Sequence, residues 1–201
     1  DKMTVFAVLM RLREICCDPR LVADNWTGSS AKLDACLELV TEAVAGGDRI
    51  LLFSQFTSML ELLAKRLDEA GVSHFTLQGS TPKPVRAEQV RRFNQGEADV
   101  FLISLRAGGT GLNLTAADIV IHYDPWWNLA AQNQATDRAY RIGQRNPVQV
   151  YRLIAQDTIE EKIVELQQAK QSLADTVTGG ADGAILSMNP EQLLQLLGEE
   201  A

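Results

Sequence analysis

Short apolar runs alternate with longer segments of helical periodicity along most of this chain, and this alternation limits its fold more than any other feature. The apolar runs, which are typical of buried strands, lie at 49–53, 73–77, 99–104, 118–122 and 148–154. The helical segments lie at 3–17, 31–44, 56–70, 85–94, 128–141 and 158–173. This order predicts an α/β fold: a parallel sheet with helices on both faces and flanking helices at both ends.

Small polar residues follow the predicted strands. The carboxyl ends of parallel strands meet at one edge of a sheet, where such folds bind their ligands. Each of these residues alone is more often an ordinary turn or cap residue. Together at one edge they can donate hydrogen bonds to backbone phosphates without reading bases. We therefore predict nucleic-acid contacts from Ser54, Gln55, Ser80, Thr81, Ser104 and Arg106.

Two arginines lie three residues apart in the predicted helix 128–141. At this spacing Arg138 and Arg141 share one helix face, and Gln134, four residues ahead of Arg138, lies on the same face. A planar guanidinium pair suits a phosphate at its moment of transfer. An isolated pair of this kind is more often a solvated surface. Here, however, it follows a glycine-rich loop and the segment Asp124–Asn128, which favours a phosphate site.

The familiar motifs that hold a nucleotide are missing. No Walker A pattern occurs, and the loop 108–111 lacks the third glycine of a dinucleotide fingerprint. That loop still allows backbone N–H groups to approach a phosphate, although it is also compatible with a simple tight turn. The carboxylates at 68–71 end a predicted helix instead of following a strand, so they do not form a magnesium box. The chain therefore lacks the groups that hold ATP and Mg²⁺.

These motifs, in this order, resemble those of the Swi/Snf family, DNA-dependent ATPases related to superfamily-two helicases. Segments 103–115, 124–128 and 134–144 resemble motifs V and VI, and 50–56 resembles motif IV. Segment 77–82, with Arg86 and 92–94, resembles the part that follows motif IV, and 12–21 resembles the helix that leads into the second lobe. The likeness runs from about Leu9 to about Leu173.

The resemblance implies a RecA-like, three-layer second lobe of a two-lobed ATPase. Residues 1–30 would form the leading helix and loop, 31–155 the lobe itself, and 156–201 a brace helix, a linker and a short terminal helix. The first lobe would be the main partner and would hold most of the ATP and the Mg²⁺. This chain alone would then be inactive.

The resemblance also assigns residue roles. Arg138 and Arg141 would be arginine fingers, and Gly111, Asn113 and Gln134 would meet the nucleotide. Gly108 and Trp127 would join the residues that contact the backbone of double-stranded DNA. From position alone, one ring of the pair Trp126–Trp127 is expected to pack inward and the other to face DNA or the partner lobe.

Composition limits the partners. The formal net charge is −7, which argues against a protein that coats DNA. Residues 132–152 nevertheless hold four arginines and one aspartate, a local charge of +3 that suits a narrow contact track. The cysteines have no metal-ligand spacing, so we expect no metal site. No run is apolar enough for a membrane span or signal peptide. We expect a cytoplasmic or nucleoid protein in a bacterium, or a nuclear one in a eukaryote.

Two other functions stay open at this point. The chain could be the second lobe of a strand-separating RNA helicase, although the Trp-Trp-Asn segment argues against it. It could also be a non-catalytic interaction module on the same fold, a reading that an upstream lobe with Walker motifs would exclude. If the chain is part of a translocase, a DNA-bound protein complex would be a further partner.

Overall fold

A sheet of five parallel strands forms the centre of the computed structural model, which describes residues 2–108, 112–138 and 147–174. The strands are β1 Ile50–Ser54, β2 His74–Leu77, β3 Val100–Ser104, β4 Ile119–His122 and β5 Gln149–Arg152. Their order in the sheet is β2-β3-β1-β4-β5, with β1 in the middle. All four pairings are parallel, which confirms the predicted sheet.

The strands share one register at their carboxyl ends. Ser54 of β1 lies opposite Ser104 of β3, and Phe53 lies opposite His122 of β4. All residues of β1, β3 and β4 are buried, because helices cover both faces of the sheet. The loops that follow these strands therefore start side by side at one edge.

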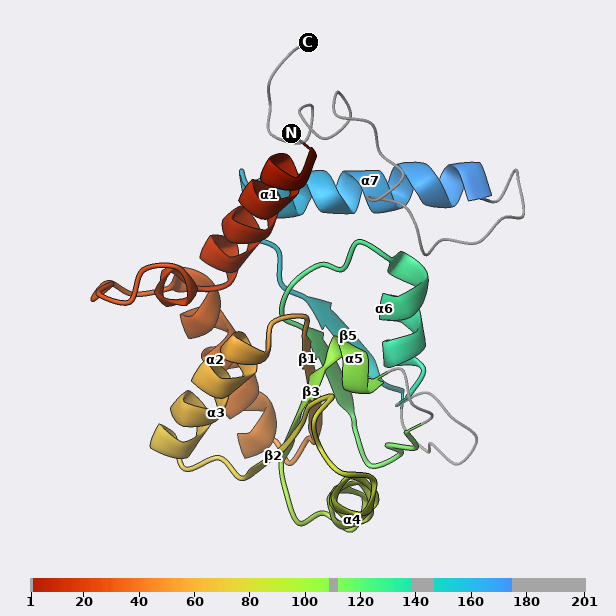
Figure 1. Cartoon of the computed structure of the whole chain (residues 1–201). Helices are drawn as coiled ribbons and strands as arrows, with labels where there is room; N and C mark the ends of the chain where they lie inside the picture. Colours follow the sequence, from red (N-terminus) through yellow and green to blue (C-terminus); the bar gives the residue numbers. More distant parts are fainter. Residues whose placement is uncertain (1, 109–111, 139–146, 175–201) are drawn as a thin grey trace.

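Helices cover each face and enclose two separate cores (Figure 1). On one face, α2 Ala31–Ala45 and α3 Thr57–Glu69 pack on Leu52, Leu102 and Ile121. On the other face lie α4 Lys83–Asn94, α5 Leu105–Gly108 and α6 Leu129–Thr136, whose buried residues pack on Phe53 and Phe101. This is the three-layer arrangement that the alternation of strands and helices predicts.

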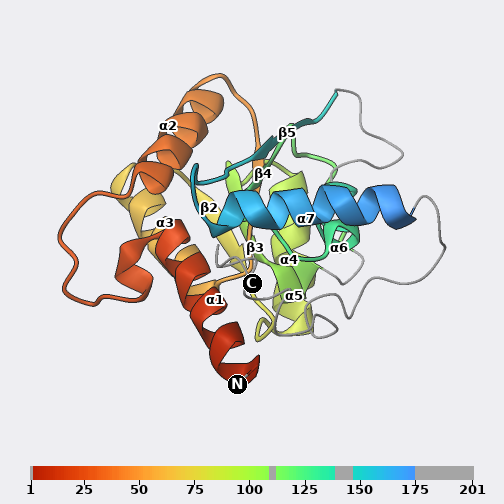
Figure 2. The same cartoon turned by 90° about the horizontal axis from the view of Figure 1, so that it is seen from above.

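Two further helices pack against each other beyond the carboxyl edge of the sheet (Figures 1 and 2). They are α1 Lys2–Cys17, followed by the short 3-10 helix η1 Pro19–Leu21, and α7 Ile159–Ala174. Leu9 of α1 and Ile163 of α7 are fully buried in the cluster that joins them. A buried ion pair also fixes α7, since Lys32 Nζ of α2 lies 2.6 Å from the Glu160 carboxylate.

One predicted element was wrong in extent. The helix expected at 128–141 ends at Thr136, and Asp137 and Arg138 form a turn. At this helix end Asp137 N donates to the Asn133 carbonyl and Arg138 N to the Ala135 carbonyl, while the Arg138 carbonyl accepts from Leu114 N at 3.1 Å. Arg138 is 5% exposed and lies in the turn after the helix, whereas Gln134 is exposed on α6.

Several predictions fall outside the described residues. They concern Gly111, Arg141, the linker expected near 176–183 and the short terminal helix after it. The proposed division into 1–30, 31–155 and 156–201 stays a prediction.

Candidate active site and nucleic-acid interface

The carboxylate of Asp124 organises the carboxyl edge of the sheet. Asp124 is the second residue after β4 and is 1% exposed. Its Oδ1 accepts a hydrogen bond from Ser54 Oγ at 2.6 Å, and both its oxygens lie 3.3 Å from the Gln55 amide nitrogen. The ends of β1 and β4 are therefore joined by one side chain.

Arg13 of α1 supplies the positive charge opposite this carboxylate. Its Nη2 lies 3.9 Å from Asp124 Oδ2 and donates to the Pro125 carbonyl at 3.0 Å. The guanidinium also stacks 5.0 Å from the Trp127 ring centre and 5.4 Å from that of Phe56. Burial lowers the pKa of Arg13 and raises that of Asp124, and the attraction between the two charges opposes both shifts. Each charge thus makes the other tolerable inside the protein.

Two serines predicted to contact DNA have other partners within the fold. Ser54 is fully buried, and its hydroxyl bonds Asp124 and accepts from Phe56 N at 3.1 Å. Ser104 is 3% exposed, and its Oγ accepts from Ala107 N in the first turn of α5. Both hydroxyls are engaged by the protein, so any effect of these residues on DNA would act through the loops that they hold.

The loops after β1 and β2 bring other predicted residues to the same edge. Gln55 is partly exposed and donates through Nε2 to the Pro125 carbonyl at 2.9 Å. Thr81 caps its own turn, since its Oγ1 accepts from Gln78 N at 3.0 Å. Ser80 is exposed beside it. The side chain of Arg106 lies outside the described part, and only the helical backbone of α5 places it and Gly108 near this edge.

The two adjacent tryptophans take different surroundings. Trp126 is 1% exposed and packs edge-on against Phe53 and His122, with ring centres 6.1 and 5.6 Å apart. This ring is the one that packs inward. Trp127 is partly buried, because Arg13 and the cluster between α1 and α7 cover one of its sides. A DNA contact by Trp127 stays a prediction, and only the uncovered part of its ring could make it.

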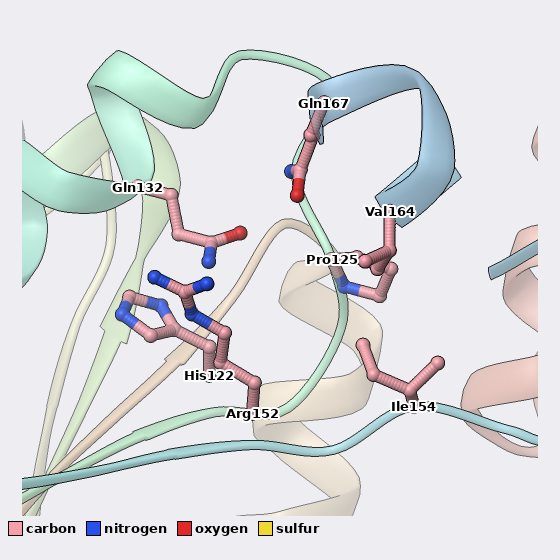
Figure 3. A pocket seen from close by; sticks show the side chains of 7 residues that line it. All are labelled: His122, Pro125, Gln132, Arg152, Ile154, Val164 and Gln167. Carbon is pink, nitrogen blue, oxygen red and sulfur yellow. The ribbon is translucent and has the colours of Figure 1, made fainter. Parts of the chain in front are cut away.

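A small pocket lies beneath α7, close to the end of β4 (Figure 3). Its lining is His122, Pro125, Gln132, Arg152, Ile154, Val164 and Gln167. Its volume of about 50 Å³ leaves room for one or two waters and excludes a nucleotide. Burial, aided by the positive charge of Arg152, lowers the pKa of His122 to about 3, so the ring is neutral at pH 7.

The segment after the glycine loop meets the arginine segment. Leu114 N donates to the Arg138 carbonyl, which places Arg138 next to the turn that carries Asn113. Asn113 is exposed, and its carbonyl accepts from the Asn94 side chain at 2.8 Å. Two of the predicted nucleotide-facing residues are thus brought together, while Gln134 points to solvent on α6.

Neither a metal site nor a membrane helix emerges from the described ranges. No group of three or more His, Cys, Asp or Glu side chains there could hold a metal ion. Likewise, none of the described helices is long and apolar enough to span a bilayer.

The parallel five-stranded sheet, with helices on both faces, is similar to the RecA-like domains of SWI2/SNF2 ATPases. The family model for the helicase conserved C-terminal domain matches residues 31–143, and the chain belongs to this family. Within it, the chain is a member of the Swi/Snf group. It is similar to the Sulfolobus solfataricus SWI2/SNF2 ATPase C-terminal domain, with a TM-score of 0.76, 30% identity and coverage of 97% of this chain and 81% of that one.

Curated relatives extend well beyond this chain. An uncharacterized ATP-dependent helicase of Mycoplasma pneumoniae is 39% identical over 197 residues, covering 98% of this chain and 19% of the relative. The SWI/SNF-related matrix-associated actin-dependent regulator of chromatin subfamily A member 1 of Mus musculus is 39% identical over 190 residues, covering 88% and 18%. The chain therefore spans about a fifth of the length of these relatives.

Sequence reasoning assigned Arg13 only to a leading helix and missed its partnership with Asp124. The two residues lie 111 positions apart, and no local pattern links them. A signal was present in the placement of an aspartate two residues after a buried strand, where its charge needs a partner.

We predict that Arg13→Met destabilises this chain by about 3–5 kcal/mol, because it leaves the Asp124 carboxylate buried without a counter-charge. Arg13→Lys should recover little, since an ammonium lacks the planar group that bonds Pro125 and stacks on Trp127. Urea unfolding of each variant measures this, with Arg11→Met on the exposed side of α1 as the control. An Arg13→Met chain as stable as the control would contradict the role of the pair.

A second prediction concerns acid sensitivity. The folded pKa of His122 is about 3, below its ordinary value of 6.5, so only the unfolded chain takes up this proton between those values. The contribution of the buried, neutral His122 to the free energy of unfolding is fully present above the ordinary pKa of 6.5 and is lost as pH falls. This loss is about 1 kcal/mol between about pH 7 and pH 5.5. Unfolding in urea at both pH values should show this loss, which His122→Gln should abolish and His74→Gln should leave in place. An equal loss in both variants would assign the effect to other groups.

Proposed function

We propose that this chain is the second RecA-like lobe of an ATP-dependent translocase on double-stranded DNA. It supplies Arg138 and Arg141 to an ATPase site that a first lobe completes. The observation that carries this proposal is the bond from Leu114 N to the Arg138 carbonyl. It ties the arginine segment to the turn at 113–117, which follows the glycine loop in the sequence and leads into β4.

The chemistry follows from charge and geometry. During phosphoryl transfer, charge spreads over the oxygens of the γ-phosphoryl group, and an arginine stabilises it by about 10³- to 10⁵-fold in rate. Arg138 is 5% exposed in the isolated lobe, so lobe closure must bring its guanidinium out toward the nucleotide. Asn113 and Gln134 are already exposed and can meet a phosphate or order the attacking water. Gly111 and Arg141 complete the proposed set.

ATP and Mg²⁺ would be held mainly by the first lobe. Bound ATP supplies the phosphoryl group, and Mg²⁺ neutralises its charge. Names of the relatives point the same way, since one is an ATP-dependent helicase and another a regulator of chromatin.

The phosphate backbone of DNA would contact the carboxyl edge of the sheet. Ser80, Thr81 and Gln55 follow β2 and β1 and can donate to phosphates without reading bases. Arg106, Gly108 and Trp127 are the further proposed contacts. Because the chain is acidic overall, we expect the lobe alone to bind DNA weakly and only at low salt. A DNA-bound protein complex would be a further partner. The protein would act in the nucleoid of a bacterium or in the nucleus of a eukaryote.

We predict that Arg138→Ala, in the full-length protein with both lobes, lowers DNA-stimulated ATP turnover by roughly 10³-fold or more. Nucleotide binding should fall much less, because the first lobe makes most of the phosphate contacts. Arg138→Lys should restore little of the rate, since an ammonium has no planar fork. Phosphate release and nucleotide titration measure the two effects.

The control for this experiment is Arg66→Ala, on the far surface of α3, where Arg66 pairs with Glu69 at 3.2 Å. The 201-residue chain by itself, for which we expect no turnover, defines the background. Near-normal turnover of Arg138→Ala would place this arginine in the structural frame of the lobe and would refute the proposed role.

A further inference from the structure

The side chain of Asn94, the last residue of α4, bridges two points of the turn that carries Asn113. Its Nδ2 donates to the Asn113 carbonyl at 2.8 Å, and its Oδ1 accepts from Ala116 N at 3.3 Å. One amide thus provides the donor and the acceptor that this turn needs. Aspartate would lose the donor and would face the Asn113 carbonyl with a negative charge.

Asn94 is held on a rigid support. The preceding residue, Phe93, is fully buried, and its ring packs 5.3 Å from that of Phe101 in the core. After Asn94, the helix ends with Gly96 at a φ of 82°, and Gly96 N donates to the Phe93 carbonyl at 2.9 Å. The backbone of Asn94 is fixed from both sides, so its amide has a defined position.

The opposite side of the same turn holds Arg138. Leu114 N donates to the Arg138 carbonyl at 3.1 Å, and the Leu114 side chain is fully buried. Ala117 N closes the turn on the Leu114 carbonyl at 3.4 Å. A continuous set of bonds therefore runs from the end of α4 through residues 113–116 to the main chain of Arg138.

We infer that Asn94 is a positioning residue for ATP hydrolysis: it fixes the 113–116 turn and, through it, the placement of Arg138. This inference rests on the proposed role of Arg138 as an arginine finger. It concerns rate and not nucleotide affinity, because a displaced arginine loses contact mainly with the phosphoryl group in transfer. A misplacement of about 1 Å costs up to roughly 10²-fold in rate.

The first test uses hydrogen exchange in the full-length protein and does not depend on activity. In Asn94→Ala and Asn94→Asp, the amides in segment 113–117 should exchange at least about tenfold faster than in the parent protein. Gln95→Ala is the matched control, because Gln95 is the next residue along the chain. Among the described residues, its side-chain amide bonds only the Arg91 side chain. Unchanged exchange in both Asn94 variants would overturn the inference.

The second test is a double-mutant cycle on DNA-stimulated turnover. Asn94→Ala should lower kcat by about 10- to 100-fold and change KM by less than about threefold. In the Arg138→Ala background the same change should have almost no further effect, because the group that it places is gone. A general loss of structure would instead multiply the two losses, and that result would overturn the inference, as would normal turnover of both Asn94 variants.

The two proposals fail in different ways. If Arg138→Ala lowers turnover and Asn94→Ala does not, only the positioning role of Asn94 is wrong. If Arg138→Ala leaves turnover intact, the arginine finger itself is wrong, and the coupling to Asn94 falls with it. Thermal unfolding of each variant reports whether the fold survives, and Asn94→Asp provides a second, nearly isosteric variant.

Discussion

The carboxyl edge of this lobe depends on one buried carboxylate, that of Asp124. Removing a carboxylate from water costs several kcal/mol, which must be offset by a counter-charge and hydrogen bonds. Arg13, Ser54 and the Gln55 amide provide them, and they come from α1 and from the end of β1. The same contacts that make the charge tolerable therefore fix the ends of two neighbouring strands and attach α1 to the sheet.

A second buried pair extends this frame to α7. Glu160 is 1% exposed, and both its oxygens lie 2.6 Å from Lys32 Nζ, while one of them also accepts from Ala155 N at 2.7 Å. Burial raises the pKa of Glu160, and Lys32 opposes that shift. The ammonium also lies 5.2 Å from the ring centre of Tyr123, the residue before Asp124. The segment from Tyr123 to Trp127 is thus held by α1, α2 and α7 together.

The turn that carries Asn113 is held by contacts separate from this frame. Asp124 and Ser54 join the ends of β1 and β4, and the Ser104 hydroxyl accepts from Ala107 N, so both serines have partners inside the fold. The Asn94 and Leu114 hydrogen bonds, together with the buried Leu114 side chain, fix the turn that leads into β4.

The sheet and its helices could be predicted because burial on both faces leaves continuous apolar runs such as 50–54. Family membership was equally accessible, since ordered motifs carry it, and the match to the helicase C-terminal domain confirms it. The end of α6 at Thr136 was not accessible, because no local sequence signal marks it. The bond from Leu114 N to the Arg138 carbonyl joins residues 24 positions apart and has no local signal either.

The site was only partly predictable. The loops that follow β1, β2 and β4 were placed correctly at one edge, yet the burial of Ser54 and the cover over Trp127 depend on Asp124, Arg13 and α7. These partners are distant in the sequence, and their contacts exist only once the sheet has formed. Residue types at strand ends therefore predicted which loops share the carboxyl edge better than the contacts that each side chain makes there.

The central claim is that this lobe contributes Arg138 to an ATPase site shared with a first lobe. It is tested most directly by a structure of the full-length protein bound to duplex DNA and to ADP with aluminium fluoride, which mimics the phosphoryl group in transfer. The account predicts that an Arg138 guanidinium nitrogen lies within about 3 Å of a fluoride. An Arg138 side chain still buried within its own lobe, with another cation at the fluoride, would contradict it.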